Sequence, residues 1–279
     1  MLNRKELNPD SSPQAAFGAR LRSSRVARGW KQDDLSALMG FSSGHISAVE
    51  TARKLPTLRF SRSADSAFGM AGTADTFERA WREIRHGALL EGFPEYVGYE
   101  GRAAEIRVYE VGVIPGLLQT AEYAAAIEAG HVERGASTAE QAHERVSLVA
   151  ERQAALVRNP PPLIHMVLDE SCIRRPVGER DVMEDQLAKL IAFAKQPNVT
   201  LQVADFAMGV RRPFSLPITV LTMADRSLMS YAESATRGHL DRETNSVLPL
   251  LTAYHQLQKH ALPQSGSMAM IELVRKGTS

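Results

Sequence analysis

The chain of 279 residues is 44% hydrophobic and carries 33 Lys and Arg against 32 Asp and Glu, a net charge of +1. This length and apolar content predict two domains with buried cores. The single cysteine, Cys172, excludes an internal disulfide and a cysteine-rich zinc site, and no apolar run approaches the ~20 residues of a membrane span. A cytoplasmic location is expected, because the N-terminus also lacks the apolar core of a signal peptide.

Charge is divided unevenly along the chain. Residues 1–63 have a net charge of +6, whereas residues 64–279 have a net charge of −5. A basic first part followed by an acidic second part is typical of a nucleic-acid-binding domain joined to a regulatory domain.

The N-terminal part is predicted to be a flexible arm followed by helices. Residues 1–12 form the arm, in which Arg4 and Lys5 could contact DNA. A first helix is predicted at 13–28, ending near Gly29. The DNA-binding domain as a whole is predicted to span residues 13–86.

Residues 32–54 have the pattern of a helix-turn-helix. Leu35 and Met39 recur at helical spacing and precede Gly40, which ends the helix in the left-handed conformation that glycine adopts readily. Ser42 is a suitable N-cap for a second short helix. Two short helices joined by such a turn predict a helix-turn-helix.

The inward faces of two helices predict a buried ion pair. Phe17, Leu21 and Arg25 share one face of the first helix, so Arg25 is directed toward the core. A half-buried guanidinium requires a carboxylate, and Glu50 on the inward face of the second short helix is the natural partner. A structural role is predicted for both residues.

The outer face of the second short helix is slender. It carries Gly44, Ser47, Ala48 and Thr51, where a solvated face normally carries Lys and Glu. Such an edge suits a DNA groove, and the helix N-terminus suits a phosphate.

Residues 17–68 resemble XRE-type (Cro- and lambda-repressor-like) DNA-binding domains. The matching residues are Phe17, Gly18, Leu21, Arg22, Arg25, Gly29, Gln32, Leu35, Gly40, Ser42, Ile46, Ser47, Glu50 and Pro56. The resemblance implies contacts with the DNA backbone by Gln32, Ser42, Arg53 and Lys54. It implies base contacts by Ser43, Gly44, His45, Ser47 and Ala48. Since most of these side chains are short, His45 and Ser43 are expected to carry most of the direct readout, with DNA shape and a second half-site supplying the rest.

The second domain is predicted at residues 99–275, after further helices from Pro56 and at 75–85 and a linker at 87–98. Strands are predicted at 106–114, 163–168, 199–204, 218–223 and 228–233. Helices are predicted at 120–129, 140–157, 181–194 and 245–259, with a last segment at 268–275. This alternation predicts an α/β layered domain with a mixed sheet, and an α+β fold class for a chain that begins with an all-α five-helix head.

No catalytic centre, metal site or cofactor is predicted. Asp169, Glu170, Asp205 and Glu233 lie at predicted strand ends, where ligands collect in open sheets, but Asp169 is favoured as a helix cap and the others as solvated residues. His165 within an apolar strand is favoured as a core residue. Glycine-rich phosphate loops are absent from the sequence.

Residues 96–275 resemble the C-terminal domain of Scr-type antitoxin-like transcriptional regulators. The motifs that carry the resemblance are the block from Pro115 to Thr120, the later Arg152-Gln153 pair and Tyr231-x-Glu233. The resemblance implies a regulator that binds a small protein encoded beside it. The residues assigned to a ligand or partner are Tyr99, Glu100, Tyr109, Arg152, Gln153, Glu170, Tyr231 and Glu233.

Three functional hypotheses follow. The first is a nucleoid-associated transcriptional regulator that binds an inverted repeat in double-stranded DNA as a homodimer. The second is an antitoxin that masks a small protein and uses DNA binding only for autoregulation. The third is a sensor of a small-molecule effector, with a pocket between the region of Tyr99 and Tyr109 and the sheet end near Tyr231 and Glu233.

Overall fold

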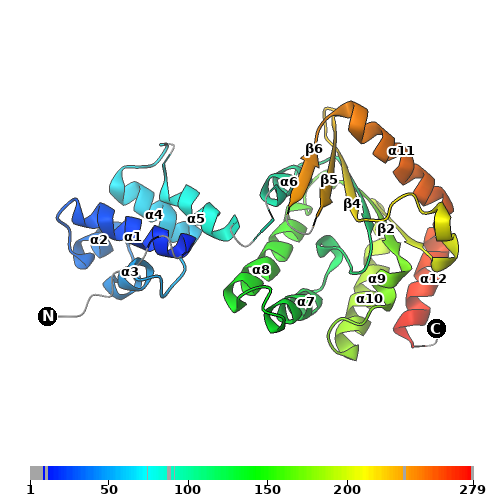
Figure 1. The fold of residues 1–279 in the computed structure, drawn as a ribbon, viewed down its shortest axis with the longest axis horizontal. Coiled ribbons are helices and arrows are strands. Elements are labelled where there is room, and N and C mark those ends of the chain that lie inside the picture. The colour runs from blue at the N-terminus through cyan, green and yellow to red at the C-terminus, as the bar shows by residue number, and fades with distance from the viewer. Residues whose placement is uncertain are drawn as a thin grey trace. The chain divides into compact units, whose positions relative to one another are not determined.

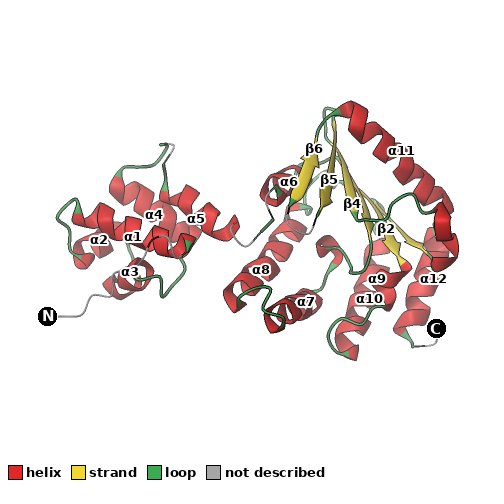
Figure 2. Ribbon diagram, viewed as in Figure 1, coloured by secondary structure: helices red, strands yellow, loops and turns green. Residues whose placement is uncertain are grey.

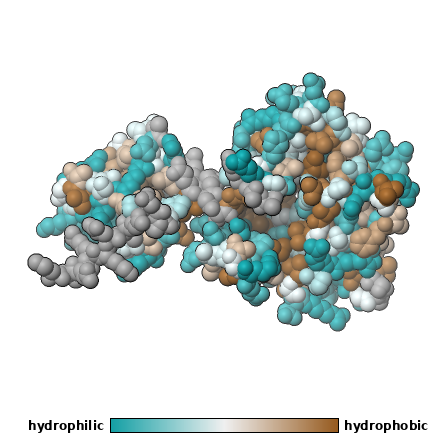
Figure 3. Space-filling model, viewed as in Figure 1, coloured by the Kyte–Doolittle hydropathy of each residue, from teal (hydrophilic) through white to brown (hydrophobic). Residues whose placement is uncertain are grey.

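The computed structural model describes residues 9, 12–73, 75–86, 89–90, 92–234 and 237–277. The chain forms two compact units, Met1–Ala88 and Leu89–Ser279 (Figure 1). Except for Pro9 and Ser12, the predicted arm, with Arg4 and Lys5, lies outside the described residues. Figure 3 shows hydrophilic residues over much of the visible surface of each unit, with hydrophobic residues gathered in places.

The first unit is an all-α head of five helices, as predicted. The helices are α1 (Pro13–Val26), α2 (Gln32–Met39), α3 (Ser43–Glu50), α4 (Leu58–Phe68) and α5 (Phe77–His86). Their shared core is built mainly from aromatic and aliphatic side chains, among them Phe17, Leu21, Leu35, Ile46, Phe60 and Phe77.

Local sequence signals set the ends of these helices. Gly40 ends α2 with a φ of 69°, and the Ser42 side chain caps α3 by accepting a hydrogen bond from the His45 N–H. Thr57 caps α4 in the same way, through the Phe60 N–H.

Helix α1 packs unusually close to the end of α3. A Cβ atom added to Gly18 would lie 2.5 Å from the Val49 carbonyl oxygen. Only a glycine therefore permits this approach of the two backbones. The contact holds the C-terminal end of α3 against the head.

The second unit contains a six-stranded mixed sheet in the order β3-β2-β1-β4-β5-β6. The strands are β1 (Glu105–Glu110), β2 (Leu163–Asp169), β3 (Val199–Ala204), β4 (Ile218–Thr222), β5 (Leu228–Glu233) and β6 (Gly238–Asp241). Strands β1, β2 and β3 are parallel, and β4, β5 and β6 continue the sheet in antiparallel pairs. The predicted α/β layered domain with a mixed sheet is confirmed.

Helices cover the two faces of this sheet unequally (Figure 2). They are α6 (Phe93–Glu100), α7 (Ala121–Glu133), α8 (Ala139–Ala155), α9 (Glu170–Arg174), α10 (Arg180–Ala194), α11 (Thr244–His260) and α12 (Gln264–Arg275), with short 3-10 turns η2 (Gly116–Leu118) and η3 (Phe206–Arg211). The larger core joins one face to α10 and α12 through Leu187 and Ile271. The smaller core joins the other face to α11 through Tyr254 and Leu257.

The structure differs from the sequence-based prediction at four elements. Part of the predicted linker at 87–98 is helix α6, because Tyr96 and Glu100 are buried and anchor it. Strand β1 ends at Glu110 rather than at 114, since Gly112 has a φ of 101° and turns the chain away from the sheet. Strand β6 and the short helix α9 have weak sequence signals and were not predicted.

Candidate nucleic-acid interface

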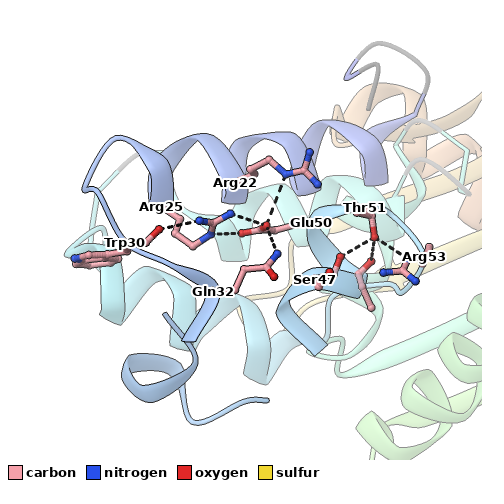
Figure 4. Close-up of polar contacts among 9 residues, drawn as sticks. Arg22, Arg25, Trp30, Gln32, Ser47, Glu50, Thr51 and Arg53 are labelled. Carbon is pink, nitrogen blue, oxygen red and sulfur yellow. Dashed lines mark hydrogen bonds and ion pairs between the residues drawn. The ribbon is translucent and has the colours of Figure 1, made fainter. Parts of the chain in front are cut away.

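The Glu50 carboxylate joins the first three helices of the head (Figure 4). It is 0% exposed and forms a bidentate ion pair with Arg25, with Nε–Oε1 and Nη2–Oε2 distances of 2.6 and 2.9 Å. This hydrogen-bonded pairing raises the pKa of the Arg25 guanidinium. Arg22 Nε lies 3.7 Å from the same carboxylate. The predicted pairing of Arg25 with Glu50 is therefore present in the structure.

Gln32 is part of this internal network. Its side-chain amide donates a hydrogen bond of 2.8 Å to Glu50 Oε2. The predicted contact of Gln32 with the DNA backbone is untested, but the amide already positions the start of α2 against the end of α3.

The slender edge of α3 is accessible in the head. Ser42 and Gly44 are exposed, and the other short residues along the edge (Ser43, Ser47, Ala48 and Thr51) are partly exposed. Because the first N–H groups of a helix lack intrahelical acceptors, the exposed start of α3 suits a phosphate.

The His45 ring packs against two aromatic side chains of the head. Its ring stacks on Phe60 at 5.2 Å between centroids and meets Phe41 edge-on at 5.1 Å. Its Nε2 atom is buried and has no hydrogen-bond partner among the described residues. Burial and the Lys54 charge lower the pKa of the ring, which favours the neutral form. The ring is therefore part of an aromatic cluster, and the base contact expected of His45 stays a prediction.

A fixed turn presents two cations just beyond α3. The Thr51 hydroxyl donates to the Ser47 carbonyl at 2.6 Å, and Arg53 Nε donates to the Thr51 oxygen at 2.9 Å (Figure 4). Arg53 and Lys54 are exposed. Ala52 between them and the helix has a positive φ of 53°, so the turn is held in a conformation that alanine rarely adopts.

Arg59 is a candidate DNA contact that the sequence analysis missed. It is exposed in the first turn of α4, and its guanidinium lies 5.6 Å from the centre of the Phe41 ring, next to Ser42. A basic residue in the first turn of the following helix is the sequence signal that could have identified it. Arg59, Arg53 and Lys54 thus lie near the two ends of α3.

The structure brings four of the predicted ligand or partner residues together in the second unit. Arg152 forms a bidentate ion pair with Glu100, with both nitrogen–oxygen distances at 2.8 Å. Tyr96 stacks on Tyr231 at 4.1 Å, and the Tyr231 hydroxyl donates to Glu233 at 2.9 Å. This group connects α6, α8 and β5.

The remaining four predicted residues make other contacts. Gln153 donates to the carbonyls of Gly116 and Gln119, which gives it a structural role. The guanidinium of Arg242 lies 4.7 Å from the centre of the Tyr99 ring. Tyr109 belongs to the smaller core, and Glu170 accepts a hydrogen bond from the Phe206 N–H.

The carboxylates at the strand ends have separate roles. Asp169 caps α9 through the Ser171 N–H, as favoured from the sequence, and Asp205 caps η3 through the Met208 N–H. His165 is partly buried within β2, and its Nδ1 atom has no partner in the described part of the chain. Across the described ranges, no three His, Cys, Asp or Glu side chains are grouped as a metal site.

Residues 16–76 match a family described as a helix-turn-helix domain. With the five-helix fold and the accessible edge of α3, this places the protein in the helix-turn-helix class and indicates a DNA-binding regulator. Residues 93–273 match the family described as "Domain of unknown function (DUF5753)", and the chain belongs to that family. No curated protein and no solved structure matches the chain. Among the helices that the structure describes, every one is too short or too polar to cross a membrane.

Replacing Glu50 by alanine should destabilise the head by about 3–5 kcal/mol, because Arg25 would be left buried without its carboxylate. Thermal unfolding followed by the fluorescence of Trp30 and Trp81, which both lie in the first unit, measures the effect. Arg62→Ala is the matched control, since it breaks an ion pair with Glu78 in which the Arg62 side chain is exposed, and pairs of this kind contribute little to stability. A Glu50→Ala protein that melts like the wild type would show that the pair is not essential.

The stability of the second unit should depend on the ionisation of Glu110. Burial raises the pKa of this carboxyl from 4.5 to about 8, and the nearby Glu233 adds to the rise. Because the folded pKa is the higher one, the contribution of Glu110 to stability is complete below its unfolded pKa and is lost as the pH rises through about 8.

The Glu110→Gln variant should therefore be more stable than the wild type by about 4 kcal/mol at about pH 8, and within about 1 kcal/mol of it at about pH 5. Denaturant unfolding at the two pH values, followed by far-UV circular dichroism, measures the difference. Glu243→Gln, at the exposed start of α11, serves as the control. An equal difference at both pH values would contradict the assigned titration.

Proposed function

We propose that this protein is a cytoplasmic, antitoxin-like transcriptional regulator that binds specific DNA sequences and is not an enzyme. The observation that carries the proposal is the edge of α3, which combines an exposed N-terminus with exposed cations near both ends. The Glu50 network and the close packing of Gly18 against Val49 hold this edge rigidly in the head. A rigid edge is what groove binding requires, because a flexible helix would lose entropy on binding.

Most of the affinity in this proposal comes from phosphates. Arg53, Lys54 and Arg59 supply charge that releases counterions from DNA, and this term does not depend on sequence. Direct base readout comes mainly from Ser43, Ser47 and the backbone near Gly44, because the His45 ring is turned toward Phe60. DNA shape and paired half-sites would then supply the remaining specificity.

Paired half-sites require two heads. We infer a homodimer on an inverted repeat, with half-site centres about one helical turn, ~34 Å, apart. The second unit would join the two copies and hold the heads at this spacing.

Band-shift titration of the full chain on its own upstream DNA tests the proposal. Sequence-specific retardation is expected at moderate salt, and Arg53→Ala should weaken binding on all sequences and reduce the salt slope by about one unit. Arg226→Ala, in the turn between β4 and β5, is the matched control and should bind like the wild type. Folded protein that fails to retard this DNA, or an Arg53→Ala loss restricted to one sequence, would count against the proposal.

A protein partner is the second candidate function, and α8 supports it. None of the 17 residues of α8, all of them described, is fully buried, and Val146, Leu148 and Val149 are only partly covered. A half-covered apolar helix suits the small protein that an antitoxin would mask.

Co-expression with the product of an adjacent small gene tests this second function. A complex that survives gel filtration is expected, and Leu148→Glu in α8 should disrupt it while leaving the DNA band shift intact. Separate elution of the two proteins would reject the antitoxin role without affecting the regulator proposal.

A further inference from the structure

Strand β1 lies at the point of the sheet where the chain reverses direction. From β1 the chain passes to β2 and then to β3, on one side, and it returns to β4 on the other side of β1. Residues 205–217, which we call the strap, connect β3 to β4 and therefore pass the carboxyl ends of β2 and β1. In open α/β sheets, the carboxyl ends of strands at such a reversal are where ligands bind.

Two carboxylates that follow β2 hold the strap in place. The Phe206 N–H donates to Glu170 Oε2 at 2.7 Å, and Arg212 Nη1 lies 2.6 Å from Asp169 Oδ2. Phe214 packs against Tyr109, with ring centroids 5.9 Å apart. The side chain of Tyr109 therefore lies beneath the strap, at the end of β1.

The Tyr109 hydroxyl is buried without a hydrogen-bond acceptor. Tyr109 is 0% exposed, and its hydroxyl donates to no residue in the described part of the chain; the nearby Arg212 guanidinium has only N–H donors and cannot accept from it. Burial raises the pKa of Tyr109 to about 12, with opposing influences from the nearby Arg212 and Asp169. The hydroxyl is therefore protonated at neutral pH and is a hydrogen-bond donor that lacks an acceptor.

The charges around this hydroxyl favour an anion over a cation. The Asp169 charge is paired with Arg212, and the carboxylate also accepts hydrogen bonds from the Ser171 N–H and hydroxyl. The Arg212 side chain is 39% exposed, and a guanidinium has more N–H donors than the contact with Asp169 uses. Arg211 and Arg175 are exposed on adjoining segments and add positive potential.

We propose that the carboxyl end of β1 binds a small organic anion, whose carboxylate or phosphate oxygen accepts hydrogen bonds from the Tyr109 hydroxyl and the Arg212 guanidinium. A bidentate contact with arginine suits both kinds of anion. The apolar Phe214 ring would contact the body of the ligand. This site does not depend on DNA binding, so its failure would leave the regulator proposal unchanged.

Calorimetric titration of the full chain tests the site, with inorganic phosphate and malonate as separate probes at constant ionic strength. We expect saturable binding of at least one probe, and the preferred probe assigns the class as phosphate or carboxylate. Hydrogen exchange should slow in peptides that cover residues 205–217. Peptides from the head should not change and serve as an internal control.

Two variants test whether the Tyr109 hydroxyl binds a ligand or only stabilises the fold. Tyr109→Phe and Arg212→Gln should each weaken anion binding about tenfold or more, whereas Arg226→Gln at the opposite edge of the sheet should bind like the wild type. Without anion, Tyr109→Phe should melt at or above the wild-type temperature, because it removes a buried hydroxyl that lacks an acceptor.

Two results would overturn the proposal. One is the absence of saturable binding of both anions by the wild type. The other is a Tyr109→Phe protein that binds anion normally but melts at a lower temperature, since the hydroxyl would then have an internal structural partner. Arg212→Gln, which changes a partly exposed side chain, keeps the test valid if Tyr109→Phe fails to fold.

Discussion

The head depends on one buried carboxylate. Glu50 accepts hydrogen bonds from Arg25 on α1 and Gln32 on α2, and it lies at the end of α3. A buried charge of this kind is tolerated only when its acceptor sites are filled, so the three helices must keep one relative arrangement. That arrangement leaves the slender side of α3 facing outward, and the proposed DNA interface is its direct consequence.

In the second unit, too, most of the buried charged groups have hydrogen-bond or ion-pair partners. The Glu100 carboxylate is hydrogen-bonded and ion-paired to Arg152, whose guanidinium lies over the Tyr96 ring. The Asp169 carboxylate accepts hydrogen bonds from Ser171 and Arg212. Several described groups depart from this pattern, among them His165 Nδ1 in β2 and two groups at the end of β1. The Tyr109 hydroxyl lacks an acceptor, and burial keeps the pKa of Glu110 raised. These last two lie at the carboxyl end of β1, which makes this end the chemically unusual part of the unit.

The two units differ in charge and in packing. The basic residues of the head lie where a DNA backbone could reach them, at Arg53, Lys54 and Arg59, and the acidic second part of the chain builds a sheet with its own two cores. An arrangement of this kind lets a signal received by the second unit alter DNA binding without changing the interface itself. The proposed anion site and the proposed partner surface on α8 are where we expect such a signal to enter.

Local patterns determined much of this protein directly from its sequence. Gly40 and Ser42 predicted the turn before α3, Thr120 predicted the start of α7, and the strands at 199–204 and 228–233 have the predicted limits, because caps and alternating side chains act within a few residues. Only the tertiary structure decided that His45 turns toward Phe60, that α6 replaces part of the predicted linker, and that Arg212 meets Asp169. These features depend on contacts between residues far apart in the sequence, and the side chains involved can form many alternative pairs until the sheet order and helix packing bring particular ones together.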